Sequence, residues 1–214
     1  MLRVTVCGGD DPRVEADDFR IFRKDLFVDR LGWALDVKSG KEVDQFDTSD
    51  CIYAIILRDD RVVAGFRAIR ADRPYLAKVV FPQLAVIASY PEDTNAYEIS
   101  RFGIDQSAQD QDSLAKLNYG LMFAFARSRG ARCLVALADP KYERYLRLNG
   151  IRSRRYGPAQ IIGHDRNRQP IEALAGEIPL TGENYQNISK LVSLTSELEI
   201  DDATLLFRRR KISA

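Results

Sequence analysis

Apolar residues recur every three or four positions in four stretches of the chain, and this spacing is typical of amphipathic helices. Glycines stand just beyond three of these stretches, at Gly32, Gly130 and Gly150, where a helix commonly ends. Asp139 and Pro140 open the third, because aspartate caps a helix and proline is tolerated in its first turn. The predicted helices span residues 18–31, 113–129, 140–148 and 185–198.

Shorter apolar runs rich in Val, Ile and Leu predict strands. The first two are separated by Asp59-Asp60, a tight turn, so we expect an antiparallel hairpin there. The order of the elements predicts an α+β protein with an antiparallel sheet at its centre. No repeat or low-complexity linker divides the sequence, so we expect residues 1–214 to form a single domain. The predicted strands span residues 52–57, 62–69, 97–104, 133–138, 161–162, 172–178 and 205–212.

Composition excludes several classes of protein. The chain has 214 residues, 45% of them hydrophobic, which is enough for a sizeable core. Lys and Arg number 32 against 31 Asp and Glu, so no overall basic footprint for nucleic acid exists and any positive patch must be local. No signal peptide opens the chain and no apolar run approaches the roughly 18 to 20 residues that span a bilayer, so we expect a cytoplasmic protein without membrane insertion.

Cysteine and histidine are too sparse for a metal site. Cys7, Cys51 and Cys133 form no C-x-x-C pair, and His164 is the only histidine, so neither a disulfide framework nor a metal centre is encoded. Ser-His-Asp or Cys-His chemistry would depend on His164. That residue lies in a Gly-His-Asp-Arg-Asn turn, which favours a solvated loop.

One arginine interrupts the apolar face of the first predicted helix. Arg23 lies four residues from both Phe19 and Phe27, so it shares their side of the helix. An arginine directed inward needs carboxylate partners, and Asp44 and Asp47 are the nearest in sequence. These contacts would pin the helix to a loop.

The same segment also suits a ligand that is both zwitterionic and aromatic. Carboxylates would hold an ammonium or sulfonium, an arginine would hold a carboxylate, and Phe27 and Trp33 would offer a face for a cation or a purine. S-adenosylmethionine has all of these features. The alternative is that both aromatic side chains are core residues, as large aromatics usually are.

A second cluster occupies the predicted strand 97–104. Alternation along a flat strand places Glu98 and Ser100 on one face and Arg101 on the other. A β-bulge, which re-aims side chains next to active sites, could bring all three to one cleft. The alternative is a structural ion pair between Glu98 and Arg101.

Taken together, ten positions resemble the acyl-homoserine-lactone synthase family, which makes bacterial quorum-sensing signals. The spacing is Arg-x3-Phe-x5-Trp-x10-Asp-x2-Asp, followed downstream by Tyr-Glu-Ile-Ser-Arg-Phe at 97–102. The resemblance is close in the first half of the chain and continues mainly as the order of elements in the second. It implies a GNAT-like α/β/α sandwich around a mostly antiparallel sheet split into a V. The ten positions are Arg23, Phe27, Trp33, Asp44, Asp47, Arg67, Phe81, Glu98, Ser100 and Arg101.

The resemblance also implies a reaction. Such enzymes transfer an acyl group from acyl carrier protein, or from coenzyme A, to the amine of S-adenosylmethionine, then close a lactone and release methylthioadenosine. S-adenosylmethionine is a substrate, and no cofactor or metal takes part. Glu98 and Ser100, with Arg101, would lie beside the acyl transfer, and Glu98 is the best-placed base if its pKa is raised. Arg67 and Phe81 would support the cleft. The residues that would form or brace the S-adenosylmethionine site are Arg23, Phe27, Trp33, Asp44, Asp47 and Arg101.

The charges of one loop and of a group of arginines bear on the identity of the acyl donor. The loop 105–112 has no glycine and three acids, which disfavours a bound pyrophosphate and hence ordinary use of acetyl-coenzyme A. Acyl carrier protein, itself acidic, would need a basic face. Arginines at the end of the third predicted helix and beyond it offer one, although they also fit a solvated helix end; the run 208–211 is a weaker candidate. The docking arginines are Arg144, Arg147, Arg152, Arg154 and Arg155.

Helix and strand periodicity group six residues as an acyl pocket, although each also fits a plain core position. Relatives that favour 3-oxo chains often carry threonine where this chain has Ala136, so we expect an acyl chain without a 3-oxo group. The predicted pocket residues are Tyr119, Met122, Ala136, Ala138, Tyr142 and Leu146.

Two other functions stay open. A related GNAT-like N-acyltransferase would use another amine, and a non-enzymatic relative would bind acyl carrier protein or an adenosyl ligand without turnover. The intact run at 98–101 speaks against the second of these. The sequence leaves the chain length, the carrier of the donor, the oligomeric state and the cognate receptor undetermined.

Overall fold

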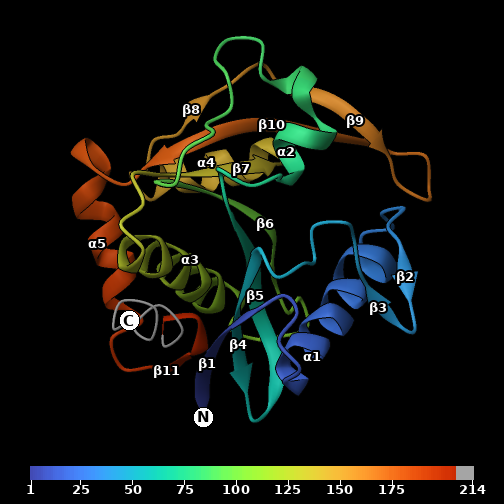
Figure 1. Cartoon of the computed structure of the whole chain (residues 1–214), viewed down its shortest axis with the longest axis vertical. Helices are drawn as coiled ribbons and strands as arrows, with labels where there is room; N and C mark the ends of the chain where they lie inside the picture. Colours follow the sequence, from blue (N-terminus) through green and yellow to red (C-terminus); the bar gives the residue numbers. More distant parts are fainter. Residues whose placement is uncertain (206–214) are drawn as a thin grey trace, which may run out of the picture.

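The computed structural model describes residues 1–205. These residues contain strands β1 to β11, five α-helices, one π-helix and two 3₁₀-helices (Figure 1). The helices are α1 (Val14–Arg23), π-helix η1 (Lys24–Arg30), α2 (Leu76–Val80), η2 (Pro82–Leu84), α3 (Gln111–Ser128), α4 (Pro140–Leu148), η3 (Gly182–Asn184) and α5 (Tyr185–Ser193). The strands are β1 (Leu2–Gly8), β2 (Val37–Lys38), β3 (Lys41–Glu42), β4 (Cys51–Arg58), β5 (Arg61–Arg70), β6 (Ala96–Ile104), β7 (Cys133–Ala138), β8 (Arg154–Arg155), β9 (Gln160–His164), β10 (Pro170–Pro179) and β11 (Glu199–Asp202).

One mostly antiparallel sheet carries the fold, in the order β11-β1-β4-β5-β6-β7-β10-β8, with β9 paired to β10. In its middle, β6 and β7 are parallel and pair only from Ala96–Cys133 to Ile99–Ala136. Beyond that point β6 continues beside β5, whereas β7 continues beside β10. The two halves of the sheet therefore diverge as a V (Figure 1), and the expected α+β, GNAT-like architecture is confirmed.

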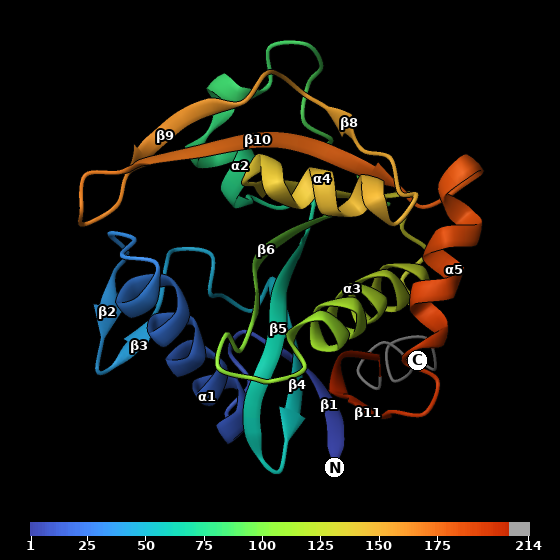
Figure 2. The same cartoon turned by 180° about the vertical axis from the view of Figure 1, so that it is seen from behind.

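Helices cover both faces of the sheet and divide the core in two. Phe19 of α1 and Ala77 of α2 belong to the cluster on one face. Phe123 of α3, Leu146 of α4 and Ile188 of α5 belong to the cluster on the other (Figure 2). The catalytic candidates lie on the face that α1 and α2 cover.

Most predicted elements are present, often with slightly longer bounds. Asp59 and Asp60 both have positive φ, at 50° and 64°, as a tight hairpin turn requires. Gly32, Gly130 and Gly150 have φ of 70°, 65° and 72° just beyond their helices. Among the residues the structure describes, no helix is long and apolar enough to cross a bilayer.

The structure corrects three predictions. The first helix begins earlier, at Val14, and changes to a π-helix after Arg23. Strand β1, which lies between β4 and β11, was not predicted, although apolar and polar residues alternate over 2–6. Helix α5 ends at Ser193 and β11 follows, where a helix to 198 was expected. The strand predicted at 205–212 lies almost entirely outside the described residues.

Candidate active site

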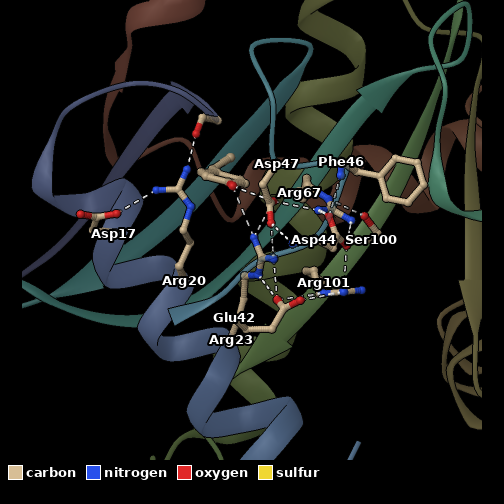
Figure 3. A network of polar contacts seen from close by, with 12 residues as sticks. Asp17, Arg20, Arg23, Glu42, Asp44, Phe46, Asp47, Arg67, Ser100 and Arg101 are labelled. Carbon is tan, nitrogen blue, oxygen red and sulfur yellow. Dashed lines mark hydrogen bonds and ion pairs between the residues drawn. The ribbon is translucent and has the colours of Figure 1, made fainter. Parts of the chain in front are cut away.

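Three arginines and three acids form one buried network on the face beneath α1 (Figure 3). They come from segments far apart in sequence, namely α1, β3 with the loop that follows it, β5 and β6. The formal charges balance, as buried ions require. The members are Arg23, Arg67, Arg101, Glu42, Asp44 and Asp47.

Arg23 ties α1 to the loop after β3. Its two Nη atoms donate hydrogen bonds of 2.8 Å to the two carboxylate oxygens of Asp47, and its Nε donates to Glu42 at 2.5 Å. The Tyr53 hydroxyl also donates to Asp47, at 2.7 Å. The arginine is fully buried, so the expectation that it points inward and pins the helix is confirmed. Its partners are Glu42 and Asp47, whereas Asp44 pairs elsewhere.

Arg67 and Arg101 hold Asp44 between them. Arg67 donates to both Asp44 oxygens, at 2.5 and 2.9 Å, and to Asp47 at 2.8 Å. Arg101 Nη2 donates to Asp44 at 2.9 Å and to Glu42 at 2.8 Å. Every guanidinium nitrogen of Arg23 and Arg67 has a partner, whereas Arg101 Nη1 has none among residues 1–205. Within the described part of the chain, Arg101 Nη1 is therefore the guanidinium nitrogen of this network that is left without a partner and can donate to a ligand.

A β-bulge turns Arg101 toward this network. The β5–β6 register shifts between the Arg67–Ser100 and Gly65–Gly103 pairs, and Arg101 has a φ of 52°. Phe102 then faces α3 instead, where its ring lies 4.6 Å from that of Tyr119. Ser100 accepts from Arg67 Nε at 3.1 Å, so Ser100 and Arg101 meet at one site. The bulge expected from the sequence is present.

Glu98 lies on the same face but is not paired with Arg101. Its two oxygens accept the backbone N–H groups of Leu76, at 3.0 Å, and Ala77, at 2.7 Å. The alternative of a direct Glu98–Arg101 ion pair is therefore wrong. Burial raises the pKa of Glu98, and the two N–H bonds and the nearby charge of Arg67 oppose that rise. The direction of the shift is the one that a general base needs.

The two aspartates of the network stay ionised. Burial opposes ionisation of Asp47, but hydrogen bonds and charge from Arg23 outweigh it and hold its pKa far below the usual range. Burial also favours the neutral form of Asp44, but the hydrogen bond and the charge of Arg67 outweigh it, so the pKa of Asp44 is lowered. Neither acid can act as a base at neutral pH. The side chains of Asp44 and Arg101 are 19% and 7% exposed, so the network reaches the surface at that side.

An aromatic pair stands at the C-terminal end of η1. The rings of Phe27 and Trp33 stack with centroids 5.2 Å apart. The backbone N–H of Trp33 donates to the backbone carbonyl of Phe27. Phe27 is buried and Trp33 is half-buried. A Cβ on Gly103 would lie 2.3 Å from a Leu26 methyl, so this glycine lets η1 approach the sheet. The tip of the β9–β10 hairpin closes over the same segment, where Arg166 N–H donates to the Gly32 carbonyl at 2.9 Å.

Aromatic and apolar groups continue beside the network. Phe46 lies against Arg67, with the guanidinium carbon 5.7 Å from the ring centroid. A hollow of about 240 Å³ opens beside it. Phe81 is half-buried after α2, and its carbonyl accepts from the Tyr90 hydroxyl, so it supports this side of the core without touching the arginines. The hollow is lined by Gln45, Phe46, Thr48, Asp50, Ile69, Pro74 and Val79.

The six residues predicted to hold the acyl chain lie on the other face, around α3, β7 and α4. Tyr119, Met122 and Leu146 are buried in one cluster, and Tyr142 is 45% exposed. Ala136 is the last residue of β7 that pairs with β6, and Ala138 lies beyond the point where β6 and β7 separate. They therefore gather where the V opens.

Three of the five arginines predicted to dock a carrier protein make ion pairs with acids. Arg155 pairs with Glu143, whereas Arg152 and Arg154 approach acids at 3.3 and 3.6 Å. Arg144 and Arg147 are exposed on α4 and have no ion-pair partner among residues 1–205. Ion pairs therefore offset part of the positive charge that the sequence predicts for this face.

Sequence reasoning missed Glu42. This residue is fully buried and accepts from Arg23 and Arg101, so it links the two arginines. In the sequence it reads as one charge in a polar Lys-Glu-Val-Asp segment. Its position two residues before Asp44 was the only available signal, because alternate residues of an extended segment share a face.

Comparisons with known proteins agree on one family. The family model described as autoinducer synthase matches residues 12–188. An acyl-homoserine-lactone synthase of Acinetobacter nosocomialis is 32% identical over 155 residues, covering 67% of this chain and 84% of the relative. The structure of BjaI, a CoA-dependent acyl-homoserine lactone synthase, with MTA matches with a TM-score of 0.83 at 20% identity over the whole of both chains. FeeM, an N-acyl amino acid synthase from uncultured soil microbes, matches less well, with a TM-score of 0.59 at 14% identity over 87% of this chain and 96% of that chain.

Proposed function

The chain belongs to the autoinducer synthase family, and we propose that it makes an acyl-homoserine lactone from S-adenosylmethionine and an acyl thioester. One observation of the site carries the proposal. Five of the charged residues that carry the resemblance to the family, Arg23, Asp44, Asp47, Arg67 and Arg101, converge on a single network, and the Phe27–Trp33 stack follows α1, on η1 and just beyond it. Residues 1–214 would act as one catalytic domain around the split sheet.

The residues divide into those that touch S-adenosylmethionine and those that brace the site. Arg23 and Arg67 are fully buried, and both donate to Asp47; Arg23 also donates to Glu42 and Arg67 to Asp44, so in the proposal they hold the cleft in shape. Asp44 and Arg101 lie at the accessible side. In the proposal Asp44 attracts the ammonium or sulfonium, and Arg101 Nη1 donates to the ligand's carboxylate.

The aromatic pair supplies the third contact. Trp33 is half-buried and stacked on Phe27, so one of its faces can lie against a purine or a sulfonium. The β9–β10 hairpin tip is bonded to Gly32, next to Trp33, and in the proposal it shields that side from water. The predicted ligand therefore lies between Trp33 and the Asp44–Arg101 edge.

The proposed chemistry has two steps and needs no cofactor. Glu98 takes a proton from the ammonium, directly or through one water, so that the amine can attack the thioester carbonyl and expel the thiol. Its raised pKa supports this role. The ligand's carboxylate oxygen then attacks the carbon next to the sulfonium. That C–S bond breaks, the lactone closes and neutral methylthioadenosine leaves.

The acyl group would enter from the opening of the V, where Tyr119, Met122, Ala136 and Leu146 gather. We propose acyl carrier protein as the donor's carrier, docked on the exposed Arg144 and Arg147 face, with acyl-coenzyme A as the alternative. Three acids in the loop 105–112 support the carrier protein, because they repel a pyrophosphate. The lack of a hydroxyl at Ala136 supports a chain without a 3-oxo group.

Incubation of the purified protein with acyl donors and a panel of amines tests the proposal. S-adenosylmethionine should give a lactone together with free methylthioadenosine, and free amino acids should give nothing. N-acylation of another amine, without methylthioadenosine, would replace the proposal by the related N-acyltransferase function. Binding of S-adenosylmethionine without turnover, over several donors, would point to the non-enzymatic relative.

A further inference from the structure

We infer that Asn118 of α3 is a positioning residue that holds Arg101 in the active site from the opposite face of the sheet. The inference rests on the proposed role of Arg101 toward S-adenosylmethionine. Asn118 is fully buried, and its amide nitrogen donates to the Gly65 carbonyl at 3.3 Å and to the Gly103 carbonyl at 3.1 Å. One side chain thus bridges β5 and β6.

The bridge lies at the bulge. Gly65 and Gly103 form the first strand pair beyond the register shift, and Arg101 and Phe102 occupy the shifted segment. Without the shift, alternation along β6 would send Arg101 to the α3 face and Phe102 to the network. The shift therefore decides which of the two side chains enters the site.

The bulged conformation needs support because Arg101 is not glycine. A positive φ brings its Cβ close to the following carbonyl oxygen, so the backbone alone disfavours this state. Glu42 and Asp44 hold the side chain from one face. Asn118 fixes the two backbones from the other, so the state is determined from both sides.

The remaining atom of the amide strengthens this interpretation. Asn118 Oδ1 is buried and has no hydrogen-bond partner among residues 1–205. A buried amide oxygen without a partner is unfavourable, so an apolar residue of similar size would suit the α3 core better if packing were all that mattered. The two hydrogen bonds that the Asn118 amide nitrogen donates to the Gly65 and Gly103 carbonyls offset this cost.

Asn118→Leu and Arg101→Gln, alone and together, test the inference. Each single variant should lower kcat/KM for S-adenosylmethionine by about 100-fold, the order of loss that an ångström-scale misplacement causes. If Asn118 acts through Arg101, the double variant should lose little more than either single variant. Independent effects would multiply to about 10⁴-fold.

Two controls separate positioning from stability. Leu121→Ala perturbs the same helix core without touching the bulge, and well below its melting temperature it should keep kcat/KM within about twofold of the wild type. Asn118→Ala serves if the leucine variant does not fold. Hydrogen exchange of the amides at 100–104 gives a readout that needs no turnover, and Asn118→Leu should lose protection there while α1 keeps its protection.

The outcomes are distinct. Failure of the wild type to use S-adenosylmethionine, or wild-type activity of Arg101→Gln, would defeat the proposed function or the role of Arg101, and this inference with it. If Arg101→Gln loses activity while Asn118→Leu keeps the kcat/KM and the hydrogen exchange of the wild type, this inference is overturned and the proposed function stands. Multiplicative losses in the double variant would also overturn it.

Discussion

Replacing Asp47 by asparagine should strongly destabilise the protein. Asp47 accepts bonds from Arg23, Arg67 and Tyr53, and its side chain is 4% exposed. The balanced network would then hold three arginines against two acids, and an amide N–H₂ group would face guanidinium donors. Leaving a buried charge without its partner costs about 3–5 kcal/mol. At about 2–4 °C per kcal/mol for a chain of this size, the melting temperature should fall by about 6–20 °C.

Denaturant unfolding at pH 7 and calorimetry measure the effect, and Asp17→Asn is the matched control. Asp17 also binds two cations, Arg20 and Lys41, but its side chain is 45% exposed, so its loss should cost about 0–1 kcal/mol. Equal destabilisation by Asp47→Asn and Asp17→Asn would refute the account of a buried, mutually saturated network.

The same network sets an acid limit on stability. The pKa values of Asp44 and Asp47 are lower in the folded protein than in the unfolded chain, where an aspartate titrates near pH 4. Their contribution is therefore complete above that pH and is lost as the pH falls toward the folded pKa values. Unfolding free energy should decline in acid, and Asp47→Asn should flatten that decline. A parallel decline in the variant would contradict the assignment.

Three further outcomes follow from the geometry. Glu98→Gln should lower kcat at least 10²-fold with nearly unchanged binding of S-adenosylmethionine by calorimetry, and full activity would remove Glu98 as the base. Arg147→Glu should raise KM for acyl carrier protein and not for acyl-coenzyme A, whereas Arg61→Glu on the β4–β5 hairpin should change neither; equal effects on both donors would exclude this docking face. Trp33 is the only tryptophan, so its fluorescence should change when S-adenosylmethionine binds. Arg166→Pro removes the donor to Gly32 and should weaken that binding about fivefold, as for a hydrogen bond of about 1 kcal/mol; unchanged affinity would exclude the hairpin from the site.

The sequence pattern predicted those helices and strands that bury one face and expose the other, or that have turn residues at their ends. Helix α3 and strand β7 are examples, because periodicity and flanking glycine mark them. The π-helix was not predictable, since a single wide turn shifts the phase of burial and leaves Leu26, Phe27 and Val28 buried in succession.

The candidate site was predictable as a set of residue types, and less so as a set of contacts. The inward direction of Arg23 followed from helical spacing, and the bulge followed from the need to unite Ser100 and Arg101. The partners depended on distant segments: Glu42 joins from the end of β3, and Glu98 is held by backbone N–H groups of the first two residues of α2. Backbone donors leave no trace in a sequence, and neither does the choice between equivalent acids.

The most direct test of the central claim is a turnover of S-adenosylmethionine labelled with ¹⁸O in both carboxylate oxygens, followed by mass spectrometry of the products. Attack of the carboxylate on the carbon next to the sulfonium predicts one lactone for each methylthioadenosine released, with both labels kept, one in the ring oxygen and one in the carbonyl oxygen of the lactone. A product that has lost one label, or an acylated amine formed without methylthioadenosine, would contradict the proposed reaction.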